Sequence, residues 1–140
     1  MHATLPAVPP RVLVADANLS NRRLIREALT AFRHCEVDDA ATAEHAYERA
    51  IQREYALFIF AISLPDMSGA MLDRLLARVY PRLHAGCLTA PAIIYLTRSE
   101  ESAAIHELQR DARVRGSVPL PLNLDALLNA TGSLLSAKSS

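Results

Sequence analysis

The sequence predicts an α/β domain with a doubly wound, five-stranded parallel sheet and five helices that cover both of its faces. Two observations support this fold class. Five short apolar runs alternate with five longer segments of helical periodicity, an order that gives parallel strands joined by right-handed helical crossovers. The strongest run, YALFIFAI at 55–62, has no polar face, as expected of a central strand buried on both sides. A length of 140 residues suits one domain of this kind.

The other four strands are shorter or weaker than the central one. They are predicted at 11–15, 35–39, 92–96 and 114–118. The first is an apolar run that ends at Asp16, the second is brief, and the fifth is thin and broken by Pro119 and Pro121.

Capping residues indicate where four of the helices begin. Asn18, Thr42 and Asn123 can cap the first, second and fifth helices, because their side chains accept hydrogen bonds from backbone N–H groups that a helix start leaves unpaired. The fourth helix is expected to begin near Thr97, whose spacing to Glu100 is that of a capping box.

The third helix lies between two segments rich in turn-forming residues. The segment SLPDMSG at 63–69 is predicted to be a loop because of its Pro and Gly. The segment 80–91, with two prolines and a glycine, is predicted to be a connection of about twelve residues, which exceeds the usual length. It could carry a specific contact or pack against the body of the domain.

The ends of the chain are expected to be loose. Residues 1–10 carry three prolines and no hydrophobic period, and are predicted to form a flexible leader. The domain is then expected to span 11–136. Residues 137–140 are expected to form a tail, and the polar residues from 136 onward are expected to fray.

Composition excludes several classes of function. Fifteen basic residues against fifteen acidic ones give no net charge, which argues against a nucleic-acid-coating protein. Lys138 is the only lysine, so a P-loop or a Schiff-base lysine in the body of the fold is excluded. Four glycines are too few for a dinucleotide-binding loop, and no cofactor is expected.

The sequence also predicts the compartment. No apolar run approaches the roughly 20 residues of a membrane span, and the N-terminus does not look like a secretory signal. We therefore expect a cytoplasmic protein with no membrane partner. Cys35 and Cys87 are expected to be free thiols, as is usual in that compartment.

Motifs at the ends of the strands resemble the receiver domains of bacterial response regulators, the CheY-like family. The resemblance covers roughly residues 11–136. Its matching segments are VLVADAN at 12–18, NRRLIREAL at 21–29, FIFAISLPDMSG at 58–69, PAIIYLT at 91–97 and VPLPL at 118–122. It implies a flavodoxin-like receiver fold with strand order 2-1-3-4-5 and a working site at the carboxyl ends of the strands. It also implies a cis peptide bond between Leu120 and Pro121.

Most of the residues that the family uses for phosphoryl transfer are replaced. In the resemblance, Ala17 takes the place of the second acidic residue, Ala61 that of the phosphate-accepting aspartate and Leu120 that of the lysine, whereas Asp16 and Thr97 remain. A methyl group cannot act as a carboxylate nucleophile, and one carboxylate where the family uses three is a poor Mg²⁺ site. We expect a degenerate pseudo-receiver that neither accepts a phosphoryl group nor binds a metal usefully.

The acidic residues near this pocket also have structural interpretations. Asp16 can accept hydrogen bonds from backbone donors at nearby helix starts rather than retain a ligand role. Asp66 lies five residues beyond Ala61, and an exposed loop acid is the simpler interpretation than a substitute phosphate acceptor.

Arg110, Arg113 and Arg115 form a candidate partner face around the fifth strand. Charged residues there could protect an edge strand from unwanted pairing. They could equally bind a carboxylate-rich partner through their forked donors, and the resemblance implies that the face formed by helix 4, strand 5 and helix 5 docks partners or forms a homodimer. Three arginines in a neutral chain give little support for nucleic-acid binding.

Three hypotheses for function follow. The first is a phosphorylation-independent receiver without catalytic activity, which acts as a protein-interaction module in two-component or phosphorelay signalling. Its partner would be a histidine kinase, another regulator or an output protein. The second is a flavodoxin-like enzyme or small-ligand-binding protein that uses the cleft at the strand ends. The third is a remnant module whose partner domain was lost or is encoded elsewhere.

Overall fold

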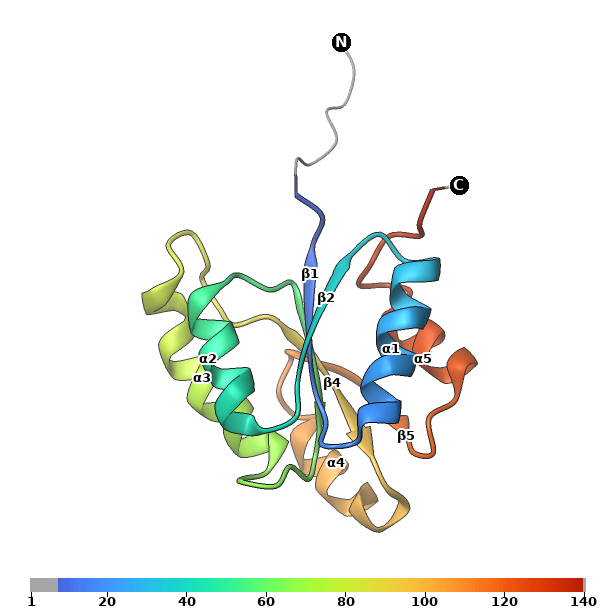
Figure 1. Cartoon of the computed structure of the whole chain (residues 1–140). Coiled ribbons are helices and arrows are strands. Elements are labelled where there is room, and N and C mark those ends of the chain that lie inside the picture. The colour runs from blue at the N-terminus through green and yellow to red at the C-terminus, as the bar shows by residue number, and fades with distance from the viewer. Residues whose placement is uncertain (1–7, 140) are drawn as a thin grey trace.

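The structure is a computed structural model that describes residues 8–139, so the first seven residues of the expected leader and Ser140 of the expected tail lie outside the described residues. Five parallel strands form one sheet in the order β2-β1-β3-β4-β5 (Figure 1). The strands are β1 (Arg11–Ala15), β2 (Glu36–Ala40), β3 (Leu57–Ala61), β4 (Ala92–Thr97) and β5 (Val114–Pro119). The predicted fold class and strand order are therefore confirmed.

Helices cover both faces of the sheet. They are α1 (Leu19–Phe32), α2 (Ala43–Gln52), α3 (Gly69–Leu83), α4 (Ser102–Leu108), preceded by the short 3₁₀ helix η1 (Ser99–Glu101), and α5 (Leu124–Thr131). The elements α1 and α5 pack on one face, while α2 and α3 lie side by side on the other, as Figure 1 shows, and α4 joins them there through Ile105. Asn18, Thr42 and Asn123 cap α1, α2 and α5, as predicted.

The central strands are buried on both sides because their side chains alternate between two apolar layers. Phe58 and Phe60 of β3 stack at 4.7 Å between ring centroids and face α2 and α3, whereas Leu57 and Ile59 face α1 and α5. All four side chains are fully buried. This double burial explains why the run at 55–62 has no polar face.

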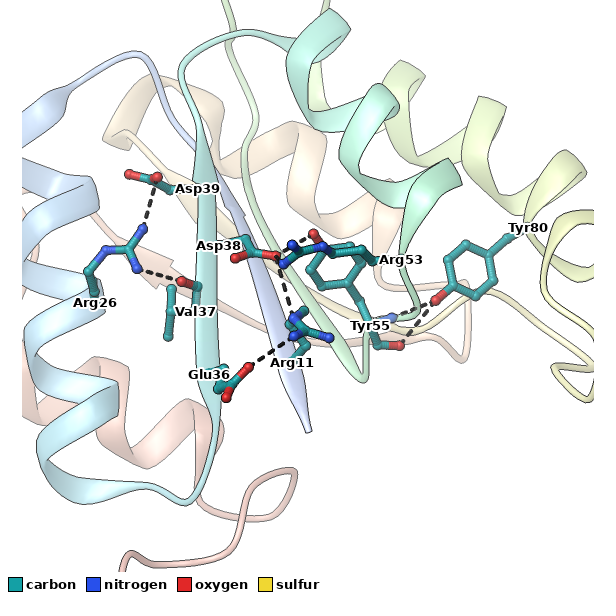
Figure 2. Close-up of polar contacts among 9 residues, drawn as sticks. All are labelled: Arg11, Arg26, Glu36, Val37, Asp38, Asp39, Arg53, Tyr55 and Tyr80. Atoms are coloured by element: carbon teal, nitrogen blue, oxygen red, sulfur yellow. Dashed lines mark hydrogen bonds and ion pairs between the residues drawn. The ribbon is translucent and has the colours of Figure 1, made fainter. Parts of the chain in front are cut away.

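The edge strand β2 is acidic, and arginines hold it from both sides (Figure 2). On the α2 side, Asp38 accepts hydrogen bonds from Arg53 and from the Tyr55 hydroxyl, the latter at 2.7 Å. On the α1 side, Arg26 donates to Asp39 and to the carbonyl oxygen of Val37. Only Val37 and Ala40 of this strand are buried apolar residues, and polar side-chain contacts supplement its pairing with β1, which explains its weak sequence signal.

Helix α3 is longer than predicted. It runs through Pro81 to Leu83, so the following connection begins at His84 rather than at residue 80. Proline lacks the backbone N–H and is tolerated best in the first turn of a helix, so Pro81, in the last turn of α3, leaves the Ala77 carbonyl without its usual intrahelical donor. Tyr80 is 1% exposed, and its carbonyl accepts the His84 N–H at 3.0 Å, so burial of this turn outweighs the proline signal.

The end of the chain does not fray where expected. The carbonyl of Ser136 accepts the His34 N–H at 2.8 Å, and the Lys138 N–H donates to Phe32 at 3.1 Å. Ala137 forms an antiparallel bridge with Arg33. The backbone after α5 is therefore held against the end of α1, because the unpaired polar groups of each segment satisfy those of the other.

Candidate functional site

A cleft of about 380 Å³ lies at the carboxyl ends of β1, β3, β4 and β5. Its lining brings together four of the five predicted pocket residues with polar groups from the neighbouring loops. The lining residues are Asp16, Ala17, Asn18, Asn21, Ala61, Ser63, Leu64, Pro65, Leu96, Arg98, Glu101 and Leu120. Thr97, the fifth predicted residue, is 8% exposed at the end of β4 and is not among them.

Asp16 is buried, and both of its carboxylate oxygens have hydrogen-bond partners. Oδ1 accepts the backbone N–H of Asn18 at 2.8 Å, and Oδ2 accepts the side-chain amide of Asn21 at 2.9 Å. Asn18 in turn caps α1. The expected structural role of Asp16 at a helix start is confirmed, because the carboxylate ties the end of β1 to the first turn of α1.

Apolar groups occupy the cleft where the resemblance would require charged ones. Ala17 and Ala61 each contribute only a methyl group, and Leu120 packs against the apolar layer beneath α1 and α5. The Leu120 N–H donates to the Thr97 carbonyl at 2.7 Å, which extends the pairing of β4 and β5 by one residue. The peptide bond between Leu120 and Pro121 is cis, as the resemblance implied.

The start of α3 comes very close to the end of β3 behind this cleft. The Gly69 N–H donates to the Ile62 carbonyl at 2.7 Å. A Cβ atom at residue 69 would lie 2.0 Å from the carbonyl oxygen of Ala61, so only glycine fits there. The close approach fixes the position of Ala61 in the cleft.

Glu101 is a cleft residue that sequence reasoning missed. The predicted capping box at Thr97 and Glu100 is displaced by one residue, because Thr97 completes β4 and the carboxylate of Glu101 accepts the Arg98 N–H at 2.8 Å. The other oxygen of Glu101 accepts the Ser63 hydroxyl, which links the loops that follow β3 and β4. The only available signal was the acid three residues after Arg98.

The Glu101 carboxylate is held in its charged form. Partial burial alone would raise its pKa, but the Arg98 N–H, the Ser63 hydroxyl and the Arg98 charge outweigh burial and leave the pKa below its ordinary value. The two carboxylates that line the cleft, Asp16 and Glu101, are therefore both engaged by protein donors. Within residues 8–139, no group of three or more His, Cys, Asp or Glu side chains is arranged to hold a metal ion.

Asp66 has a structural role across the loop. Its two carboxylate oxygens accept the N–H groups of Ala43 and Glu44, both at 2.9 Å, at the start of α2. These two bonds hold the pKa of Asp66 below its ordinary value. Because both oxygens are directed to α2, Asp66 is not oriented as a substitute for the carboxylate missing at Ala61.

The three arginines of the predicted partner face do not act together. Arg113 donates to Asp73 at 2.6 and 3.0 Å and to the carbonyls of Ala90 and Pro91, and only 15% of its side chain is exposed. It therefore joins α3 to the start of β4, and its guanidinium is already engaged within the domain. Arg110 and Arg115 are exposed, on opposite sides of Arg113 in the chain.

Several solved structures with the same fold are receiver domains or response regulators. The chain is similar to the signal receiver domain of an HD domain-containing protein from Pseudomonas fluorescens Pf-5, with 20% identity, a TM-score of 0.76 and coverage of 96% of this chain and 92% of that one. The chemotaxis response regulator CheY4 of Vibrio cholerae matches with 22% identity, a TM-score of 0.70 and coverage of 90% and 98%. The REC domain of AraT, a response regulator from Geobacillus stearothermophilus, matches with 24% identity, a TM-score of 0.72 and coverage of 89% and 91%.

At these identities the likeness establishes the fold, which is that of a response-regulator receiver domain. No protein-family profile matches the chain, and no curated protein sequence matches it. Among residues 8–139, none of the helices has the length and apolar character needed to cross a membrane.

Proposed function

We propose that this chain is an atypical receiver that acts in two-component or phosphorelay signalling in the cytoplasm through protein contacts, without accepting a phosphoryl group. The observation that carries the proposal is the composition of the strand-end cleft. A methyl group stands at Ala61, where an acceptor carboxylate would be needed, and both oxygens of Asp16 already accept hydrogen bonds. A carboxylate is the nucleophile in aspartyl phosphorylation, and an alanine cannot replace it.

The residues in the cleft also do not fit a bound Mg²⁺ ion. Magnesium prefers an octahedral set of oxygen ligands that includes carboxylates with free lone pairs. Asp16 and Glu101 are the two carboxylates that line the cleft, and each of their oxygens already accepts a protein hydrogen bond, so fewer lone pairs remain for a metal ion. The side chain of Leu120 offers no positive charge to a phosphoryl oxygen.

The output of such a module is a fixed surface rather than a switched one. Arg110 and Arg115 are the exposed cations of the region formed by α4, β5 and the start of α5, and they suit a carboxylate-rich signalling partner. That partner would be a histidine kinase, another regulator or an output protein. The alternative of a small-ligand site in the cleft is not favoured, because the similar solved structures reported above are signalling receivers.

Phosphoryl transfer to the intact chain tests the proposal. The wild-type protein is incubated with acetyl phosphate and Mg²⁺, and its intact mass is compared with that of the variant Ala17→Asp/Ala61→Asp/Leu120→Lys. We expect no added phosphoryl mass on the wild type and a Mg²⁺-dependent adduct on the variant. An adduct on the wild type, located on Asp16 or Asp66 by peptide mapping, would refute the proposal.

Docking is tested separately with a captured signalling partner. Retention of the partner by the wild type and its loss from Arg110→Glu/Arg115→Glu would support the face. The matched control is Arg23→Glu, because Arg23 is also exposed but lies on α1, which packs beside β1 and β2 rather than beside α4 or β5. Partner binding that both variants keep would exclude this face.

A further inference from the structure

The surface formed by α2 and α3 carries an apolar groove that the cleft chemistry does not explain. The groove has a volume of about 420 Å³ and is lined mainly by Tyr47 and Ile51 of α2, Met67 of the preceding loop and Leu75 of α3. A second hollow continues it along α3, where Tyr47, Leu75 and Val79 line its apolar part. Leu75 is 37% exposed, and its neighbour Met71 is 43% exposed.

An acidic pair of side chains lies beside the groove, and a basic pair lies beside the hollow that continues it. Glu44 and Glu48, one helical turn apart on α2, line the groove itself. Arg78 and Arg82, one turn apart on α3, line the hollow that continues it. All four side chains are exposed, and none forms an ion pair with another side chain of residues 8–139.

We infer that this α2–α3 face is a self-association surface, and that its occupant is a second copy of the chain. An interface between identical copies uses the same patch on both subunits, so the patch must be complementary to itself. A two-fold axis that passes between the acidic row and the basic row sets the acidic row of one copy opposite the basic row of the other, and does so twice. The apolar side chains between the rows are then buried in the middle of the interface, with the charges at its rim.

The balance of charge favours a second copy over a peptide of one sign. An acidic segment would meet Glu44 and Glu48, and a basic one would meet Arg78 and Arg82, so either would be repelled by one row. A second copy presents both an acidic row and a basic row, so each row can face a row of opposite charge. The inference is independent of the proposed function, because none of these residues belongs to the strand-end cleft.

The α2–α3 face also differs from the face first expected to form a homodimer. Among the described residues of α4, β5 and α5, Leu124 is the only large apolar residue that has more than a third of its surface exposed. This surface has little exposed apolar area to bury against an identical copy.

A mixing experiment with charge-reversed chains tests the inference. One variant, Glu44→Arg/Glu48→Arg, carries only basic rows beside the groove, and the other, Arg78→Glu/Arg82→Glu, carries only acidic ones. The mass in solution is measured by light scattering after size exclusion, over a concentration series, for the wild type, for each variant and for their equimolar mixture. Circular dichroism spectra confirm that each variant is folded.

We expect the wild type to reach twice the monomer mass as its concentration rises. Each variant alone should associate at least about tenfold more weakly, because like charges then face each other across the axis. The equimolar mixture should recover the dimer, since each basic row then meets an acidic one. The control Arg23→Glu/Glu27→Arg on α1 reverses two exposed charges away from the groove and should behave as the wild type.

Three results would overturn the inference. The first is a wild type that stays monomeric up to its solubility limit. The second is a dimer that both groove variants retain. The third is a dimer that Arg110→Glu/Arg115→Glu abolishes while the groove variants leave it intact, which would assign self-association to the region of α4 and β5.

Discussion

Removing the carboxylate of Asp73 should destabilise the fold strongly, because it would leave the charge of Arg113 buried without its partner. Asp73 is 5% exposed at the residue level and accepts two hydrogen bonds from the Arg113 guanidinium, at 2.6 and 3.0 Å. Hydrogen bonds to charged groups contribute roughly 1.5–3 kcal/mol each. Loss of one member of a buried ion pair costs about 3–5 kcal/mol.

We expect Asp73→Ala to lower the free energy of unfolding by about 3 kcal/mol, at the lower end of that range. The reason is that 15% of the Arg113 side chain reaches solvent, and its bonds to the carbonyls of Ala90 and Pro91 remain. Urea unfolding followed by far-ultraviolet circular dichroism measures this change. With a slope of about 2 kcal/mol per molar urea, the midpoint falls by roughly 1.5 M.

A surface ion pair gives the matched control. Arg110 and Glu107 lie 3.8 Å apart with 80% and 72% of their side chains exposed, so Glu107→Ala should change stability by less than about 1 kcal/mol. Replacing both members of the buried pair, as in Asp73→Leu/Arg113→Leu, should restore much of the loss, because no uncompensated charge is left. If Asp73→Ala costs no more than Glu107→Ala, the structural role assigned to Arg113 is wrong.

Three further changes test other contacts. Gly69→Ala would place a Cβ atom 2.0 Å from the Ala61 carbonyl oxygen, so we expect a loss of roughly 3 kcal/mol or more in urea unfolding, and an unchanged midpoint would contradict this close approach. Tyr80→Phe would leave the buried Tyr55 N–H, now bonded to the Tyr80 hydroxyl at 2.7 Å, without a partner; we expect a loss of about 1–3 kcal/mol by the same measurement, and a neutral effect would argue against this bond. Asp66→Asn tests the α2 cap by its pH dependence: the pKa of Asp66 lies below its ordinary value of 3.8, so the stability that the carboxylate adds is present above that value and is lost as the pH falls through the folded-state pKa. The variant should therefore be less stable than the wild type at neutral pH and should approach it in acid, and a difference that is the same at both pH values would exclude this role.

Local patterns were enough to predict the sheet and most helix starts. The strands at 11–15 and 92–96 are continuous apolar runs, and Asn18, Thr42 and Asn123 cap their helices by contacts within three residues. Such signals depend only on residues that are close in the sequence, so they can be recognised before the fold is known.

The errors arose where a distant contact decides the structure. Arg113 turns inward because Asp73, forty residues away, receives it. Asp66 is an exposed loop acid, as predicted, but its contact with the start of α2, twenty-three residues earlier in the chain, has no local sequence signal. The extension of α3 through Pro81 depends on burial of Tyr80 against Tyr55. The order of the chain end depends on the hydrogen bond from the Lys138 N–H to the Phe32 carbonyl at the end of α1.

The cleft was predicted in part for the same reason. The resemblance placed Asp16, Ala17, Ala61 and Leu120 together, and the structure brings all four to one cleft. It did not indicate Glu101, whose link to Ser63 joins two loops thirty-eight residues apart. Sequence motifs locate the strand ends, whereas the contacts between loops that shape the cleft appear only in the folded chain.

Calorimetric titration with Mg²⁺ tests most directly whether this cleft can support receiver chemistry, because metal binding requires neither a kinase nor a phosphoryl donor. The wild type is compared with Ala17→Asp/Ala61→Asp, which returns two carboxylates to the cleft beside Asp16. We expect no saturable heat with the wild type and one-to-one binding with the variant. Saturable one-to-one binding to the wild type that Asp16→Asn abolishes would contradict the inference that the cleft has lost its metal site.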